Sequence, residues 1–310
     1  SWADIPVTPF ILANILGGVG MSYYVSAYDI FTPIYSMTAT GLGIAASRLV
    51  AEQAAVFGAE GGREVLRASR RVFLLLGLLG MGLLLALAPA FARTINNPGA
   101  TLAVCAIAPA VVFSCISAVY RGYFQGMTNM IPTAKSQVLE SLVRLTAGTA
   151  LSYGVTLFLR RRYLETGAVL GRSFATLDEA SLFLFRFSAA AAIAGVTAST
   201  MAGALYIRGR YRRETRGLHH SRKRETASPK GLVLRLLQIA IPISLSTLVV
   251  NLTSVIDLMS VMNCLKTAIA SDGAAIRQMY DGLIPAAVTN DLLPEYLYGS
   301  YSGLAFSLFN

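Results

Sequence analysis

Glu140 and Arg144 are the residues of this sequence best placed to do chemistry in an apolar setting. They are four residues apart with the acid first, a spacing that favours an ion pair on one helix face. Thr133, Gln137 and Gly148 continue the same face at steps of three and four. A guanidinium can hold a carboxylate or the oxygens of a phosphate. A structural ion pair and a ligand site are both open at this stage.

Two further helix faces carry polar residues at the same spacing. Helical neighbours three and four apart share a face. Small hydroxylated residues also line ordinary helix contacts in bilayers, so packing is an alternative reading. The two faces are Asp29, Thr32, Ser36, Thr40, Gly43 and Ser47, and then Ser244, Thr247, Asn251 and Ser254 followed by Asp257.

Ionisable side chains favour a functional reading of these faces, since a charge that faces lipid costs several kcal/mol and therefore tends to face a partner or water. We expect the three faces to line one hydrated cavity. The candidate cavity residues are Asp29, Arg48, Gln137, Glu140, Arg144, Asn251 and Asp257.

The elements that must position these residues are membrane-spanning helices. The chain is 55% hydrophobic and only 14% charged. Uncharged apolar runs of about 20 residues, enough to cross a bilayer as helix, occupy 72–92, 100–120, 187–207 and 236–256. A weaker span covers 30–47, and 145–159 reaches membrane length only if its helix begins near Thr133 and includes Glu140 and Arg144. The sequence predicts an all-α, polytopic helix bundle in the cell membrane.

The net charge of +10 is distributed unevenly along the chain. Loops 48–71, 121–135 and 208–235 fall on one side of the predicted spans and hold 17 Lys and Arg, against 8 on the other side. The positive-inside rule makes the first side cytoplasmic, although Arg160, Arg161 and Arg162 fall outside. The basic run 207–230 could suit nucleic acid, but attraction to anionic membrane lipids explains it better, so no nucleic-acid partner is expected.

Metal, cofactor and enzyme chemistry have little support in the sequence. His219 and His220 are adjacent and would face different directions on a helix, and Cys105, Cys115 and Cys264 have no metal-site or disulfide spacing. A membrane glycosyltransferase would need an acidic catalytic pair, but the outer acids near Asp178 and in 272–295 lie in no supporting motif. We expect a protein that is not an enzyme and that has no metal or cofactor.

The run RGYFQGMTNMIPTAKSQVLESLVR, residues 121–144, closely resembles the loop and fifth helix of the stage V sporulation protein B-like, polysaccharide biosynthesis branch of the multidrug/oligosaccharidyl-lipid/polysaccharide flippase superfamily. Residues 23–52 and 240–261 resemble the family's second and seventh helices. The residues that carry the motif are Arg121, Gly122, Gln125, Gly126, Pro132 and Ser136.

This resemblance implies the N-terminal lobe of a two-lobe transporter, as a fragment of a longer protein. The implied division is 1–28 as a truncated or distorted first span with an outer loop, 29–207 as helices two to six, 208–235 as a basic cytoplasmic loop, and 236–310 as the seventh helix, an outer loop and the start of the eighth. The chain departs from the family pattern at its start, where FILANILGG lacks the basic residues often found there, and in its long outer loop 160–186.

The function that the resemblance implies is flipping of a lipid-linked saccharide, a precursor of peptidoglycan or surface polysaccharide, to the outer leaflet by alternating access. Arg48 and Arg144 would attract an undecaprenyl-pyrophosphate group, while Asp29 and Glu140 would pair with them or respond to protons or cations. The alternatives are a cation-coupled exporter of small molecules from the same superfamily and a non-transporting membrane assembly partner.

Overall fold

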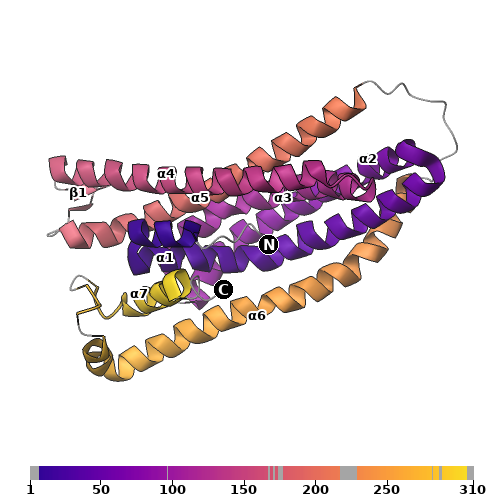
Figure 1. The fold of residues 1–310 in the computed structure, drawn as a ribbon. Helices are drawn as coiled ribbons and strands as arrows, with labels where there is room; N and C mark the ends of the chain where they lie inside the picture. The colour runs from indigo at the N-terminus through magenta and orange to yellow at the C-terminus, as the bar shows by residue number, and fades with distance from the viewer. Residues whose placement is uncertain are drawn as a thin grey trace.

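A bundle of long antiparallel helices makes up the computed structural model of the chain (Figure 1). The structure describes residues 7–95, 97–166, 168–169, 172–173, 177–216, 229–280, 282–285 and 288–305. The major helices are α1 (Val7–Tyr35), α2 (Gly41–Thr94), α3 (Thr101–Gly126), α4 (Ile131–Thr166), α5 (Leu177–Thr215), α6 (Pro229–Met279) and α7 (Leu293–Ser300). Short elements join them: the π-helix η1 (Ser36–Thr40), the 3-10 helix η2 (Pro98–Ala100), the hairpin β1 (Ala168–Val169) and β2 (Arg172–Ser173), and the π-helix η3 (Tyr301–Ala305).

Five helical segments are long and apolar enough to cross a bilayer: Ile11–Thr94, Pro98–Gly126, Ile131–Glu165, Ala180–Thr215 and Gly231–Met279. They contain every span that the sequence predicts, so the chain is an all-helical, multi-pass membrane protein. The weakest expectation is confirmed as well, because α4 begins at Ile131 and carries Glu140 and Arg144 within one continuous helix.

The first of these segments is bent by glycine. Gly17 has φ 61° and Gly58 has φ 67°, a region that glycine adopts with little strain. At Gly58 the chain turns back, since a β-carbon at Gly61 would lie 2.4 Å from the backbone oxygen of Gln53. The arm that carries the polar face of α1 and η1 is therefore followed by an antiparallel arm that ends at Thr94 (Figure 1).

The connections gather at two ends of the bundle. The turn at Gly58, the α3–α4 turn and the end of α5 lie at one end, while the β1–β2 hairpin and the α6–α7 connection lie at the other (Figure 1). We call the first the basic end, since it carries the described parts of the three basic segments of the sequence. Residues 217–228, which include His219 and His220, lie outside the described residues.

Glycines set the register of the helix pairs. On α3, Gly122 and Gly126 lie against α2, where added β-carbons would come within 2.9 Å of the Gly43 oxygen and 2.5 Å of the Ser47 oxygen. A β-carbon on Gly195 of α5 would lie 2.4 Å from the Cα of Gly148 of α4. Small residues allow such close approach of membrane helices. The polar residues of these helices are thereby held at fixed heights along the bundle.

The main core lies among α1, α2, α3 and α5. By contrast α6 packs mainly along α2 and leaves a row of apolar side chains exposed, such as Ile241, Leu245 and Val249. It also continues beyond the predicted span to Met279, with a break in helical geometry at Asp272.

Candidate functional site

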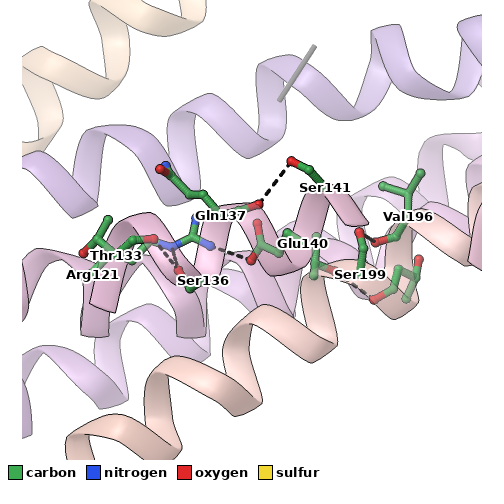
Figure 2. Close-up of polar contacts among 10 residues, drawn as sticks. Arg121, Thr133, Ser136, Gln137, Glu140, Ser141, Val196 and Ser199 are labelled. Atoms are coloured by element: carbon green, nitrogen blue, oxygen red, sulfur yellow. Dashed lines mark hydrogen bonds and ion pairs between the residues drawn. The ribbon is translucent and has the colours of Figure 1, made fainter. Parts of the chain in front are cut away.

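Arg121 of α3 and Ser136 and Glu140 of α4 form the best-defined charged cluster among the described residues (Figure 2). The Nη2 group of Arg121 donates to Oε1 of Glu140 at 2.6 Å, and its Nε donates to the Ser136 hydroxyl at 3.0 Å. The Ser136 hydroxyl in turn donates to the Thr133 carbonyl at 2.8 Å. The two charged side chains are 14% and 13% exposed, so the pair is largely removed from water. The cluster ties α3 to α4.

The α3–α4 turn brings these residues together. Backbone N–H groups of Met127, Thr128 and Asn129 bond to carbonyls of the last turn of α3, and Thr128 has a left-handed φ of 59°. Pro132 then stands in the first turn of α4, where the missing N–H costs no helical bond. As a result α4 returns along α3 with Ser136 and Glu140 beside Arg121.

A glycine on α5 makes room for the carboxylate. A β-carbon at Gly203 would lie 1.9 Å from Oε1 of Glu140. The carboxylate is thus enclosed by Arg121 on one side and the backbone of α5 on the other, near Ser199 (Figure 2). An unpaired carboxylate here would be expensive, so Arg121 is its required counter-ion.

The other motif residues have packing roles that the structure makes plain. Gly122 and Gly126 allow α3 to contact α2, as described above. Between them, the ring of Tyr123 packs edge-on against Tyr211 of α5 at 5.2 Å. Gln125 is partly exposed, and its carbonyl accepts the bond from the Thr128 N–H that closes the turn. The motif therefore builds a three-helix junction of α2, α3 and α5 and turns the chain into α4.

Arg144 lies one helical turn beyond Glu140 and near α1. Its guanidinium lies within electrostatic range of the Tyr24 and Tyr35 side chains, and Arg121 and Glu140 lie within that range of Tyr35. On α1 a ladder of four rings faces this region, Tyr24, Tyr28, Phe31 and Tyr35, with successive centroids 6.4, 6.0 and 5.4 Å apart. Two guanidinium groups and one carboxylate thus lie beside a run of aromatic side chains.

Gln137 does not join the cluster. Its side chain is exposed and points away from the ion pair, while its backbone carbonyl accepts a bond from Ser141 at 3.1 Å (Figure 2). Its role as a cavity residue stays a prediction.

Along α1 and α2, the predicted polar face divides into separate local contacts. Asp29 accepts a hydrogen bond from the Tyr298 hydroxyl of α7 at 3.1 Å. The hydroxyls of Thr32 and Ser36 bond to the carbonyls four residues before them, so they are satisfied within the helix. Arg48 is 68% exposed at the basic end and pairs with Glu52 at 3.3 Å.

On α6, the polar-face residue Ser244 donates to the Met37 carbonyl of η1 at 2.9 Å. The Asn251 amide donates to the Thr247 carbonyl of its own helix at 2.7 Å, and Asp257 is exposed. The charged candidates from sequence therefore fall into three places: the Arg121–Glu140–Arg144 region, the Asp29–Tyr298 contact, and the exposed charges of α2 and α6.

Arg121 is the residue whose role sequence reasoning missed, since it was assigned to the motif and Glu140 to an intrahelical pair with Arg144. A usable signal existed. If the turn spans 127–130, Arg121 and Ser136 are each six residues from it, so an antiparallel hairpin places them opposite each other. Within the described ranges, no group of three or more His, Cys, Asp and Glu residues could hold a metal ion.

Comparison with known proteins decides the family. A family model described as "Polysaccharide biosynthesis protein" matches residues 6–177, more than half of the chain. The chain belongs to the polysaccharide biosynthesis protein family. Among its curated relatives, "Stage V sporulation protein B" of Bacillus subtilis (strain 168) is 29% identical over 299 residues, which cover 96% of this chain and 52% of the relative. "Lipid II flippase MurJ" of the same organism is 31% identical over 147 residues, 44% of this chain and 26% of the relative.

A solved structure shares the fold. It is titled "Inward-facing conformation of a multidrug resistance MATE family transporter of the MOP superfamily", and it matches with a TM-score of 0.54 and 17% identity over 96% of this chain and 69% of that one. The fold and the family resemblance expected from the sequence are confirmed. This polysaccharide biosynthesis family member spans about half the length of the curated relatives it matches.

Proposed function

We propose that the protein flips a lipid-linked saccharide of the undecaprenyl-pyrophosphate type from the cytoplasmic to the outer leaflet. Membership of the polysaccharide biosynthesis family and similarity to a relative named a lipid II flippase support this class of substrate. The single observation that carries the proposal is the charged Arg121–Glu140–Arg144 region on the membrane-spanning helices α3 and α4.

The chemistry of the region suits an anionic head group. Arg121 compensates the Glu140 carboxylate, so the region as a whole keeps a positive charge with Arg144 included. A guanidinium offers a planar fork of donors for pyrophosphate oxygens. Tyr28 and Tyr35 are partly exposed beside it and combine an apolar ring with a polar tip, a combination suited to a sugar. The prenyl tail would stay in lipid while the head group crosses.

Alternating access requires helices that bend. α1 and α2 are interrupted at Gly17, at the π-helix η1 and at Gly58, and single π turns of this kind often lie at functional sites. We propose η1 as the bend that changes the exposure of the aromatic ladder. The basic end would face the cytoplasm, in accordance with its excess of Lys and Arg.

The test is translocation in vesicles. The 310-residue chain is reconstituted with a fluorescent lipid-linked saccharide, and a membrane-impermeant quencher reports the fraction that reaches the outer leaflet. Transfer faster than in vesicles with an unrelated helical membrane protein supports the proposal. Folded protein without transfer removes the flippase assignment for this chain and leaves the assembly-partner alternative.

A cation-coupled exporter of small molecules is the second candidate. The fold of a multidrug transporter favours it, and the Asp29–Tyr298 contact is an acidic group that could respond to cations. An imposed Na⁺ or H⁺ gradient separates the candidates, since export of a soluble dye that depends on the gradient and on Asp29, without saccharide transfer, favours the exporter.

A further inference from the structure

Arg63, Arg67 and Tyr211 form a cluster at the basic end that the proposed transport route does not use. Arg63 and Arg67 are one turn apart on the second arm of α2, within electrostatic range of the Tyr211 hydroxyl of α5. This arm lies against the ring that Tyr211 contacts, since a β-carbon on Gly62 would lie 3.5 Å from the Tyr123 ring. The Tyr211 ring is fixed by contacts with Tyr120 and Tyr123 of α3, at 5.5 and 5.2 Å. Two cations and a hydroxyl are therefore held together by three helices.

Arg63 has an unsatisfied donor at this place. Its Nε is buried and has no hydrogen-bond partner within the described part of the chain. An unmet buried donor is unfavourable, and an arginine next to a second arginine attracts an anion strongly. The combination suits a phosphate group, which supplies several acceptor oxygens and a negative charge.

The exposed helix faces next to the cluster indicate which kind of molecule the phosphate belongs to. One face of α2 runs Arg63, Arg67, Arg70, Leu74 and Leu78 at steps of three and four, and Leu74 and Leu78 are exposed. The arginines lie toward the basic end, and the leucines follow toward the middle of the bundle.

The last part of α5, which packs against the other partner of α2, helix α3, repeats this order in the opposite chain direction. Met201 and Leu205 are exposed, and Arg208 and Arg212 follow on the same face toward the basic end. Both helices pack against α3, and each carries arginines toward the basic end and exposed apolar residues toward the middle of the bundle. A phospholipid has the same order, with a phosphate at the surface and acyl chains inside.

We propose that Arg63, Arg67 and Tyr211 bind the phosphate of an anionic phospholipid in the leaflet at the basic end, with its acyl chains along Leu74, Leu78 and Leu205. The two guanidinium groups hold the phosphate oxygens, and the Tyr211 hydroxyl donates a further bond. The lipid closes the junction of α2, α3 and α5 that the Gly122–Gly126 motif builds. This site is independent of whether the protein flips saccharides.

The experiment titrates detergent-solubilised full chain with phosphatidylglycerol and counts bound lipids by native mass spectrometry, with phosphatidylcholine as the neutral comparison. One phosphatidylglycerol should bind more tightly than the rest. The double variant Arg63→Gln, Arg67→Gln should weaken that binding roughly 25-fold, about fivefold for each arginine near the headgroup. Tyr211→Phe should weaken it severalfold and leave the other bound lipids unchanged.

The matched control is Arg213→Gln with Arg216→Gln, which removes two exposed charges at the same end. An equal loss in the two double variants would show diffuse attraction and overturn the site. Equal competition by soluble glycerol phosphate would overturn the lipid assignment, since the leucines would then contribute nothing. The melting temperature of each variant without lipid is measured first, and Arg67→Lys replaces the double variant if the latter does not fold. Lysine keeps the charge but loses the forked donor, so unchanged tight binding in Arg67→Lys would likewise overturn the site.

Discussion

The guanidinium of Arg121 lies 2.6 Å from the Glu140 carboxylate, although the two residues are 19 positions apart in sequence and lie on either side of the α3–α4 turn. This contact joins α3 to α4 at the height where Gly203 of α5 leaves room for the carboxylate. It makes Glu140 part of the packing of three helices, and it leaves the positive charge of Arg144 one turn further along the same helix. Both stability and ligand binding should depend on it.

Replacing Arg121 by Ala should destabilise the protein strongly, because Glu140 would keep its charge in a nearly dry position. Breaking a buried pair from one side costs about 3–5 kcal/mol. Thermal unfolding in detergent, followed by size-exclusion chromatography, measures the effect. Arg48→Ala is the control, since that exposed pair with Glu52 contributes only about 0–1 kcal/mol. Equal unfolding temperatures for the two variants would contradict the assigned role of Arg121.

Gly203→Ala should destabilise the packing around Glu140 through the volume of the added methyl group alone. The added methyl group would overlap Oε1 of Glu140, and overpacking of this kind costs about 1–3 kcal/mol. Gly209→Ala, on the same helix with no atom within 4 Å of its added β-carbon, should be neutral or gain up to ~1 kcal/mol of helix propensity. In a Glu140→Ala background, which is itself destabilised because Arg121 loses its partner, Gly203→Ala should cost less than it does in the parent protein. A Gly203 variant as stable as the Gly209 variant would rule out close packing here.

Arg144 should contribute charge for the pyrophosphate and not only a structural contact. We expect Arg144→Lys to lose transfer of the lipid-linked saccharide partially and Arg144→Ala to lose it almost wholly, each normalised to folded protein. Binding of the labelled lipid in detergent gives a second readout that does not depend on transport. Near-parental transfer in Arg144→Gln, which leaves the Arg121–Glu140 pair intact, would leave Arg144 a structural role only.

The basic end should face the cytoplasm. In a background without Cys105, Cys115 and Cys264, single cysteines at Arg216 and Leu283 report the two ends, and both positions are exposed. An impermeant maleimide added to intact cells should label position 283 and not 216. Permeabilised cells, in which both should react, control for reactivity. Strong labelling at 216 alone would reverse the proposed orientation.

Glu295 should make stability fall as pH rises. Burial in α7, outside the five candidate spans, raises the pKa of its carboxyl above the ordinary 4.5, and Lys266 at 3.8 Å offsets this only in part. The contribution of Glu295 to the free energy of unfolding is therefore fully present below the ordinary glutamate pKa. It is lost as the pH rises through the raised pKa of the folded state. Melting temperatures between pH 4 and pH 9 should show Glu295→Gln gaining on the parent protein at the upper end. Glu165→Gln, which removes an exposed carboxylate, is the charge-matched control. If the difference in melting temperature between the parent and Glu295→Gln did not change with pH, this account would be contradicted.

The sequence by itself determined the class of protein and the places of the helices. Apolar runs long enough to cross a bilayer are a local property, because each helix satisfies its own backbone in lipid. The same local rule placed Glu140 and Arg144 inside α4, since the apolar run after them was too short alone. The motif of residues 121–136 was specific enough to indicate the family that the comparison confirmed.

Only the tertiary structure decided which polar residues meet. Helical periodicity indicates that residues share a face but not what that face contacts. Asp29 meets Tyr298 from a segment 269 positions away, and Ser244 meets the backbone of η1, contacts that depend on how distant helices pack. Glu140 is paired across helices because a four-residue turn and three glycines, Gly148, Gly195 and Gly203, fix how α4 lies between its neighbours. The physical reason is that register in a helix bundle is set by turns and close backbone approach, which no single helix encodes.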